Sequence, residues 1–466
     1  MNIIMINPAT PNTARISLDF DLKIDYTGRF PPIGLISLAA YIREHSKHNI
    51  EIVDCDAEEV DIVKHIKNRD VDIIGIISFT YTFFDVLQLC RLIKMNFSGL
   101  PIVVGGPHTP LFPRETLSHT EIDYLVIGEG EEAFLYLLNK IENGQVPDKI
   151  EGLAFRNGKE IFVGSPAWIN KLDDLPFPAY DLLKPDKYHA TFGYGGKTIT
   201  LCTSRGCPFN CTFCQSTKKF RANSLQYIME YITSFHKQGY RNFYFFDDTF
   251  NITASRVIEF SRAVRAEKLK IKWIFRGRVD GITEELCREA SLAGCVQMLL
   301  GIEDYTNEGL LRIKKRVTIE KAEKAVACAK RYGIKTNTNW IIGLPSHKTL
   351  SDLEELVRTA INIKSDFAMF SLLTLLPGCE LFEEAAAEGV IKRTSWYDYV
   401  SNPVPKYQIE FYDKYISGEE LTRFYASAYR KYYRRPGYIL QRMLDLRSFS
   451  ELKNKIPMAL KILLQN

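Results

Sequence analysis

Residues 202–214 read CTSRGCPFNCTFC, and this stretch decides the fold and the chemistry that we expect of the chain. It holds four of the ten cysteines and follows a short apolar run that is typical of a strand. Cys207, Cys211 and Cys214 are separated by three and by two residues, so their side chains can converge on one metal centre. Soft thiolates select zinc, copper(I) or iron–sulfur clusters. A closed zinc site would need Cys202 as its fourth ligand. We favour a cluster, because Cys202 ends the apolar run and its side chain need not face the loop.

From Thr198 onward, short apolar runs alternate with segments of helix length. The predicted strands are Thr198–Cys202, Asn242–Asp248, Lys272–Arg278, Val296–Glu303, Thr336–Pro345 and Phe367–Pro377. Six such βα units predict a barrel or an incomplete barrel. Functional residues are expected at the carboxyl ends of its strands.

A second alternating array occupies residues 1–145. Its predicted strands are Asn2–Pro8, Ile50–Asp56, Ile73–Phe79, Pro101–Pro107 and Tyr124–Gly130, with amphipathic segments such as Ile33–Lys47 between them. This pattern predicts a parallel sheet covered by helices on both faces. Ligands of such folds bind at the carboxyl ends of strands. In this chain those ends carry Ser78, Gly105, Gly106, His108, Gly128, Glu129 and Gly130.

The chain is therefore predicted to be an α/β protein with four parts. These are a doubly wound domain (1–148), a linker with a hairpin (149–190), a partial (β/α)6 barrel (191–385) and a helical C-terminal segment (386–466). The hairpin is predicted from Asn157-Gly158, a pair that favours tight turns, between two apolar runs.

The composition excludes several classes of protein. Hydrophobic residues make up 46% and charged residues 25% of the 466 residues, which is ordinary for a globular protein. A net charge of +4 is too close to balance to indicate nucleic acid as a partner, and none is expected. The N-terminus lacks the pattern of a secretory signal, and no stretch approaches the roughly 20 apolar residues of a membrane span. We therefore expect a cytoplasmic protein with reduced cysteines.

The cysteine loop, with Phe213 before its last cysteine, resembles the cluster loop of radical SAM enzymes. In that family three cysteines bind a [4Fe–4S] cluster and leave one iron open for S-adenosylmethionine (SAM). Reductive cleavage of SAM then yields a 5′-deoxyadenosyl radical. The resemblance implies that Cys207, Cys211 and Cys214 are the metal ligands.

Motifs at four later strand ends are similar to the SAM-binding segments of the same family. The sequence FFDDTF at 245–250 resembles the segment that contacts the methionyl amino group, and Glu303 resembles the glutamate that binds the ribose. Gly343 lies in a turn like the one that meets the adenine, and Arg278 fits a basic position that pairs with a carboxylate. The implied SAM-binding residues are Phe213, Asp247, Asp248, Arg278, Glu303 and Gly343. Each motif alone has a structural alternative, since paired acids often cap helices and Gly-Leu-Pro often forms a turn.

The doubly wound domain resembles the cobalamin-binding domain that precedes the barrel in one class of radical SAM enzymes. The matching pieces are residues 31–35, 105–108 and 126–131. The resemblance implies that the seven strand-end residues named above bind cobalamin. A flavin or nucleotide site is the alternative, but no Gly-x-Gly-x-x-Gly opens the first helix. The Asp-x-His-x-x-Gly motif that supplies an axial histidine in other cobalamin proteins is absent, and we do not expect His108 to ligate cobalt.

The C-terminal segment is basic and rich in aromatic residues, most of all over Tyr425–Tyr438. We favour a cover that closes the open side of the barrel, with arginine stems packed on aromatic rings. A membrane-surface helix is the alternative. Cys379 lies near the top of the barrel, but we expect it to be a small core residue rather than a radical relay.

These resemblances imply a cobalamin-dependent radical SAM enzyme with a [4Fe–4S] cluster, SAM and cobalamin as cofactors. The implied reaction is methylation of an unactivated carbon of a small or lipid-like substrate, with reduced ferredoxin or flavodoxin as the electron donor. The alternatives are a non-methylating oxidative cyclase of the tetrapyrrole type and, outside enzymes, a corrinoid- or metal-binding regulator.

Overall fold

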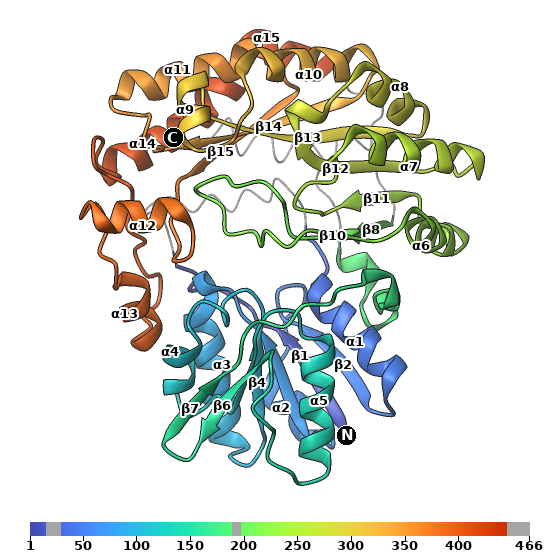
Figure 1. The fold of residues 1–466 in the computed structure, drawn as a ribbon, viewed down its shortest axis with the longest axis vertical. Coiled ribbons are helices and arrows are strands. Elements are labelled where there is room, and N and C mark those ends of the chain that lie inside the picture. Colours follow the sequence, from blue (N-terminus) through green and yellow to red (C-terminus); the bar gives the residue numbers. More distant parts are fainter. Residues whose placement is uncertain (15–28, 189–196, 445–466) are drawn as a thin grey trace. The chain divides into compact units, whose positions relative to one another are not determined.

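The chain divides into two units, which the computed structural model describes over residues 1–14, 29–188 and 197–444 (Figure 1). The first unit comprises residues 1–14, 29–188 and Arg393–Ile409, and the second comprises residues 197–392 and 410–444. No helix in these ranges is long and apolar enough to cross a membrane.

The first unit contains the predicted doubly wound sheet, in the order β2-β1-β3-β4-β5-β6-β7. Its parallel strands are β1 (Asn2–Asn7), β2 (Asn49–Asp54), β3 (Ile73–Ile77), β4 (Ile102–Gly105) and β5 (Tyr124–Val126). Its helices are α1 (Ile33–His45), α2 (Ile62–Lys67), α3 (Phe83–Asn96), α4 (Pro113–Ser118) and α5 (Glu131–Glu142). Helix α1 packs beside α5, and α2 packs beside α3. Isoleucine and valine dominate these strands because a parallel sheet is buried on both faces.

The predicted hairpin extends this sheet. Strand β6 (Leu153–Asn157) pairs antiparallel with β5, and β7 (Glu160–Val163) pairs antiparallel with β6. Gly158 in its turn has a φ of 63°, which a glycine adopts without steric cost. The hairpin therefore belongs to the first unit's sheet, and three single-turn 3₁₀ helices follow it, at Leu172–Asp174, Tyr180–Leu182 and Pro185–Lys187.

A distant segment, residues 393–409, completes the first unit, and we call it the strap. It contains α13 (Ser395–Ser401), which packs on α4. The Tyr399 hydroxyl accepts a hydrogen bond from the Phe84 backbone N–H (3.3 Å), and His119 Nε2 donates to the Val400 carbonyl (2.8 Å). Lys406 N donates to the Asn12 carbonyl (3.0 Å). The strap thus contacts the loop after β1, the first turn of α3 and the C-terminal end of α4.

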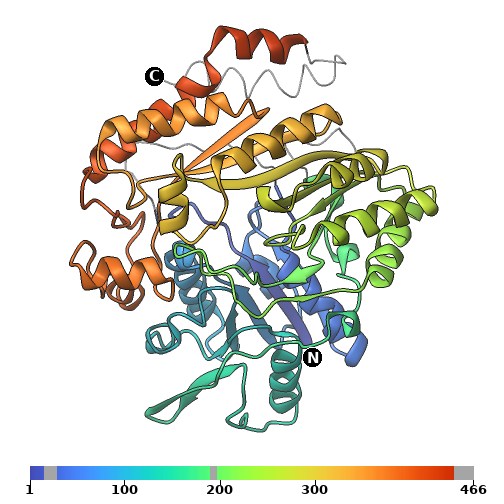
Figure 2. The ribbon, with the colours of Figure 1, turned by 45° about the horizontal axis from the view of Figure 1, so that its top comes forward.

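The second unit contains the predicted incomplete barrel, a six-stranded parallel sheet in the order β15-β14-β13-β12-β11-β8. The strands are β8 (Thr198–Leu201), β11 (Asn242–Phe245), β12 (Lys272–Arg278), β13 (Cys295–Glu303), β14 (Lys335–Ile342) and β15 (Phe367–Leu372). The helices between them are α6 (Leu225–Lys237), α7 (Ala254–Ala266), α8 (Glu284–Leu292), α10 (Ile319–Arg331) and α11 (Leu350–Asn362), and Figure 2 shows them along the outer side of the sheet. Shorter elements are β9 (Ser204–Arg205), β10 (Arg221–Ala222), α9 (Asn307–Arg312) and α12 (Glu380–Ala387). Cys379, 2% exposed, directly precedes α12.

The two faces of this sheet differ sharply in chemistry. The outward face is aromatic: Phe245 and Trp273 pack edge to face with Phe260 of α7 (5.0 and 5.1 Å between centroids). The alternation of side chains along each strand and the strand register place mostly polar residues on the inward face. They include Thr200, Tyr244, Arg276, Gln297, Asn337, Asn339 and Ser371. Polar side chains of this kind can bind a polar ligand, which an apolar packed core could not.

Tyrosines of α14 (Gly418–Tyr433) close the free edge of β15. The Tyr429 hydroxyl accepts from the Phe370 N–H (3.1 Å) and donates to the Phe370 carbonyl (2.8 Å). The Tyr433 hydroxyl does the same for Ala368 (3.1 and 2.7 Å). Beyond it, in α15 (Pro436–Leu444), Tyr438 donates to Asp366, and Arg435 lies over the Tyr432 ring. The expected packing of an arginine stem on an aromatic ring is therefore present beside the β15 edge of the barrel. The expected cover over the open side of the barrel stays a prediction, and residues 445–466 lie outside the described residues.

Candidate functional site

The cysteine loop is anchored at its start, its middle and its end. Cys207 N donates to the Thr217 carbonyl (2.8 Å), and Lys218 Nζ donates to the Phe209 carbonyl (2.7 Å). Thr212 N donates to the Ile313 carbonyl (3.0 Å), and the Thr212 carbonyl accepts from Leu381 N (2.9 Å). The loop conformation is thus set by α9 and α12 as well as by the loop itself. Cys207, Cys211, Phe213 and Cys214 are all half-buried.

Two of the three predicted ligand sulfurs have hydrogen-bond partners. Cys214 Sγ accepts from Ser216 N (3.4 Å), and Cys207 Sγ lies 3.5 Å from Thr249 Oγ1. Hydrogen bonds to ligand sulfurs are among the factors that set the potential of an iron–sulfur cluster. Within the described ranges, no three His, Cys, Asp or Glu side chains are arranged to hold a single metal ion. Three half-buried thiols on one anchored loop therefore fit a cluster, and Cys202 is exposed.

The structure separates the two acids of the FFDDTF motif. Asp247 is 1% exposed and accepts from Ser204 Oγ (2.5 Å) and Thr203 Oγ1 (3.1 Å). Burial raises the pKa of Asp247 to about 6, although these hydroxyls and the nearby Arg256 lower it in part. Asp248 instead is exposed and accepts from Ser216 Oγ (2.5 Å), two residues beyond Cys214. Asp248 is therefore the acid beside the cysteine loop. Asp247 is instead a buried acceptor that fixes the backbone segment after β8 through Thr203 and Ser204.

Glu303 stands at the end of β13 in a strained conformation. Its φ is 86°, in the left-handed region that non-glycine residues rarely occupy. Its carboxylate forms a buried ion pair with Lys315 Nζ (2.9 Å), and both residues are under 10% exposed. Backbone strain of this kind is found preferentially at functional sites. Lys315 was not predicted from the sequence, because it lies in a Lys-Lys-Arg run that resembles an ordinary solvated surface.

Arg278 joins several parts of the same strand-end region. It forms two hydrogen bonds to the Asp280 carboxylate (both 3.0 Å) and one to the Lys315 carbonyl (2.5 Å). Its guanidinium also stacks on the Phe209 ring of the cysteine loop, 3.9 Å from the centroid. The predicted carboxylate partner of Arg278 is thus Asp280 in this structure, and Arg278 positions the loop.

The turn at Gly343 is held by a residue that the sequence analysis missed. Gly343 has a φ of 87°, and its N–H and that of Leu344 both donate to His347 Nδ1 (3.1 and 3.2 Å). His347 is 2% exposed, and its Nε2 faces the fully buried Asp304 at 3.8 Å. Asp304 follows Glu303, so the His347–Asp304 pair links the ends of β13 and β14. The signal that could have found it is the acid pair Glu303-Asp304 at a strand end.

In the first unit, the ends of β3 and β4 are packed together. Ser78 N donates to the Gly105 carbonyl (2.8 Å), and the Ser78 carbonyl accepts from His108 N (3.2 Å). Gly106 has a φ of 100°, and a Cβ there would lie 2.8 Å from the Ser78 carbonyl oxygen. Local backbone packing therefore already requires this glycine. Phe79, 45% exposed, stands next to these residues.

The His108 ring is a structural group. It is fully buried, with Nδ1 3.2 Å from Thr80 Oγ1 and Nε2 3.0 Å from Thr116 Oγ1, and it stacks on Phe83. Burial lowers the pKa of His108 to about 3, so the ring is neutral. Both ring nitrogens are engaged, so the structure gives no support to the ring of His108 as a cobalamin contact; only its backbone lies at the strand ends.

The Gly128-Glu129-Gly130 sequence is turned toward the linker. A Cβ at Gly128, whose φ is 86°, would lie 2.5 Å from the Ala167 carbonyl oxygen. Glu129 Oε2 accepts from Ile169 N (2.7 Å). These residues therefore hold the linker against the end of β5. At this edge the backbone of Gly105 and Gly106 is half-buried and the ring of Phe79 is exposed, and an apolar ring beside glycine backbone fits a large flat ligand such as a corrinoid.

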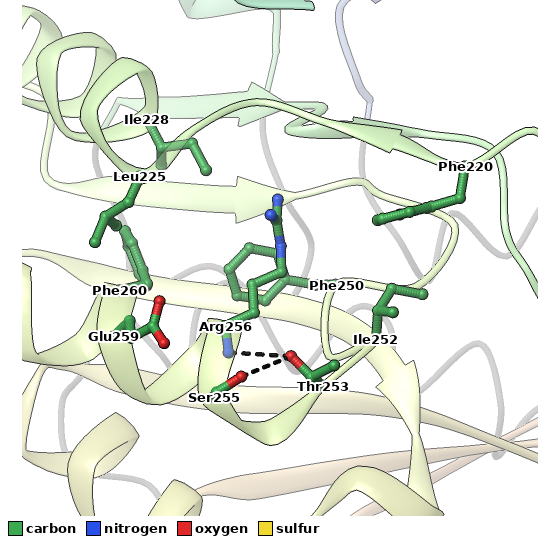
Figure 3. A pocket seen from close by; sticks show the side chains of 10 residues that line it. All are labelled: Phe220, Leu225, Ile228, Phe250, Ile252, Thr253, Ser255, Arg256, Glu259 and Phe260. Carbon is green, nitrogen blue, oxygen red and sulfur yellow. Dashed lines mark hydrogen bonds between the residues drawn. The ribbon is translucent and has the colours of Figure 1, made fainter.

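A cavity of about 300 Å³ lies between α6 and α7 (Figure 3). Arg256 extends into it from α7 in Figure 3 and donates through Nη2 to the carbonyl and the hydroxyl of Thr203 (3.1 and 3.0 Å). The other lining residues are Phe220, Leu225, Ile228, Phe250, Ile252, Thr253, Ser255, Glu259 and Phe260. None of them is a predicted site residue, so this cavity is separate from the strand-end site.

Two family models match the chain. The B12 binding domain matches residues 21–138, and the Radical SAM superfamily matches residues 201–360. The protein named "Uncharacterized methyltransferase PH0819" of Pyrococcus horikoshii is 32% identical over 460 residues, with 96% of each chain covered. The anaerobic magnesium-protoporphyrin IX monomethyl ester cyclase of Rubrivivax gelatinosus is 26% identical over 89% of this chain and 76% of the cyclase.

A solved structure shares the fold across both units. The radical S-adenosylmethionine methyltransferase TsrM of Kitasatospora setae, with cobalamin and a [4Fe–4S] cluster bound, superposes with a TM-score of 0.67 at 17% identity. The match covers 83% of this chain and 78% of TsrM. The order of the two domains agrees with the sequence analysis, and the predicted fold class and the cofactor set of [4Fe–4S] cluster, SAM and cobalamin are confirmed. The chain therefore belongs to the family of radical SAM enzymes that carry an N-terminal cobalamin-binding domain.

Proposed function

We propose that this enzyme transfers a methyl group to an unactivated carbon of a small or lipid-like organic substrate. The observation that carries the proposal is the 32% identity over 96% of both chains to a protein named as a methyltransferase. The cobalamin-binding and radical SAM domains supply the two cofactor sites that such a reaction requires. When bound, the cluster supplies the electron that cleaves SAM, and the corrinoid supplies the methyl group.

The proposed cofactor contacts follow from the geometry of the second unit. Cys207, Cys211 and Cys214 would hold the cluster. Asp248, beside the loop, is suited to the methionyl amino group, and Glu303 to the ribose hydroxyls. The ion pair with Lys315 limits the rotation of the Glu303 carboxylate, which holds it in place to accept hydrogen bonds. Gly343 presents backbone to the adenine, and His347 fixes that turn.

The remaining predicted contacts act indirectly in this proposal. Asp247 and Arg278 position the strand end and the loop, and Phe213 lies within the loop. In the first unit, the backbone of Gly105 and Gly106 is proposed to face the corrinoid, and the fully buried Ser78 is proposed to support that backbone from below. The boundaries at residues 148, 190 and 385 remain predictions.

Methylation and oxidative cyclisation leave different products of SAM. Both generate 5′-deoxyadenosine, but methylation through cobalamin consumes a second SAM and releases S-adenosylhomocysteine. We expect the reconstituted enzyme, given a reductant and a small-molecule extract, to form both compounds. Methyl-deuterated SAM should then label the product. Formation of 5′-deoxyadenosine alone, with no labelled product, would favour the cyclase alternative, which the Rubrivivax relative supports. Formation of neither would leave a corrinoid- or metal-binding regulator.

The proposed electron donor is reduced ferredoxin or flavodoxin. Lys218 and Lys219 are exposed directly after the cysteine loop, and their charge suits an acidic protein carrier. A peripheral membrane contact through residues 386–466 has less support, because Tyr429, Tyr432 and Tyr433 are turned onto the barrel. Reduction rates at rising ionic strength test the donor: they should fall with salt if charge guides the encounter.

A further inference from the structure

Arg276 is a cation in the barrel interior whose guanidinium is held in place on one side only. It lies on the inward face of β12, in register with Leu299 of β13. Its Nε donates to the Tyr244 hydroxyl (3.0 Å), and its guanidinium lies 3.7 Å from the centroid of the Phe246 ring. These two contacts fix the plane of the guanidinium, and neither uses the terminal Nη groups.

Arg276 forms no ion pair with any residue that the structure describes. No carboxylate in the described parts of the chain lies within 4 Å of its guanidinium, although the side chain is only partly exposed. Arg278, two residues further along the same face, shows the contrast, since it is paired with Asp280 and donates to the Lys315 carbonyl. A partly buried charge without a partner is unfavourable in the free protein, and its planar fork of donors matches carboxylate and phosphate.

The neighbouring inward faces carry unpaired polar atoms as well. Gln297 Nε2, Asn337 Oδ1 and Asn339 Oδ1 are buried and have no hydrogen-bond partner within residues 1–14, 29–188 and 197–444. Gln297 and Asn337 are 1% and 2% exposed, and they lie on the adjacent strands β13 and β14. A buried polar atom without a hydrogen-bond partner is unfavourable in the free protein. Three such atoms on two adjacent strands indicate an interior built to bind a polar molecule.

We propose that Arg276 binds a carboxylate or phosphate group of the substrate, with the amides of Gln297, Asn337 and Asn339 facing its polar remainder. The substrate class is therefore an anionic, hydrogen-bonding small molecule. This inference rests on the proposed function, since it assigns the chemical class of that enzyme's substrate. The carboxylate of SAM is the other anionic group that Arg276 could bind, and the experiment distinguishes it from a group on the substrate.

Arginine footprinting tests the proposal on the wild-type enzyme. Phenylglyoxal modifies accessible guanidinium groups, and mass spectrometry reports the rate at each residue. Inorganic phosphate is the probe, and Arg262, an exposed residue of α7 paired with Glu285, is the reference. We expect phosphate to slow the modification of Arg276 about fivefold or more relative to Arg262, with and without SAM. Absence of protection, or an Arg276 that reacts as slowly as Arg278, would overturn the proposal.

Two further arms identify the source of the anion. If SAM protects Arg276 and decarboxylated SAM does not, the group bound is the SAM carboxylate, and the proposal is wrong. Arg276→Gln should keep the dissociation constant of SAM within about twofold of wild type, with Arg276→Lys as the conservative variant; a tenfold loss, about 1.4 kcal/mol, would also assign Arg276 to SAM. Failure of the proposed function is seen separately, as a wild-type enzyme that binds no cluster or cleaves no SAM.

Discussion

Replacing Tyr429 with phenylalanine should destabilise the barrel by an amount that the structure allows us to work out. The ring stays, and with it the edge-to-face contact with Phe370 (5.5 Å between centroids). The hydroxyl alone is lost, together with its two hydrogen bonds to the N–H and the carbonyl of Phe370. Because Phe370 is 1% exposed, neither group gains easy access to water.

Each orphaned backbone group costs about 1–3 kcal/mol, so we expect a total of about 2–4 kcal/mol after partial solvation. For a unit of this size that corresponds to a fall in Tm of roughly 4–15 °C. Thermal unfolding followed by circular dichroism measures the shift. The matched control is Tyr415→Phe, since Tyr415 is 46% exposed and its Tm change should stay within about 2 °C. Equal shifts for the two variants would refute the reasoning, because water would then satisfy the strand edge as well as the tyrosine does.

Three further outcomes are expected. Cys211→Ala should reduce iron from about four atoms per chain to a small fraction, whereas Cys202→Ala should retain it; equal loss in both would contradict the assigned ligands. The pKa of Asp247 is raised to about 6, so between about pH 4 and pH 6 the folded protein keeps a proton that the unfolded chain releases. The free energy of unfolding of the wild type should therefore fall by on the order of 3 kcal/mol as the pH rises through this window. Asp247→Asn should lack this slope in Tm-against-pH profiles, and parallel profiles would show that Asp247 titrates normally. Lys315→Met leaves the buried Glu303 carboxylate without its partner and should lower the free energy of unfolding by about 3–5 kcal/mol. The Glu303→Gln/Lys315→Met double variant should recover part of this loss. If the double variant is no more stable than Lys315→Met, the loss does not come from the unpaired carboxylate.

The sequence predicted the strands of both sheets to within a few residues, because each is a local run of apolar residues. It could not predict the partners of elements whose contacts are distant along the chain. The hairpin at 153–163 was assigned to a linker, and its pairing with β5 depends on where the edge of the first sheet lies. The strap was included in a cover for the barrel, because nothing in Ser395–Ser401 indicates that its partner is α4.

The same limit applies to the sites. The cysteines and Glu303 were found because they belong to motifs with fixed spacing. Lys315 and His347 were missed, since each acts through a residue on another element. Gly106 and Gly128 were assigned to a ligand, but their positive φ values and close backbone neighbours give each a packing reason that no spacing reveals.

The strap has a consequence for synthesis on the ribosome. Residues 393–409 are translated only after every strand of the barrel, yet Tyr397 packs edge to face on Phe112 and Val400 receives the hydrogen bond from His119 in the first unit. A nascent chain that has just passed residue 190 therefore carries a sheet whose loops lack these partners. The cobalamin-binding unit becomes complete last, although its sequence comes first, so a fragment cut after the linker should expose apolar surface and require chaperones that the full-length chain does not.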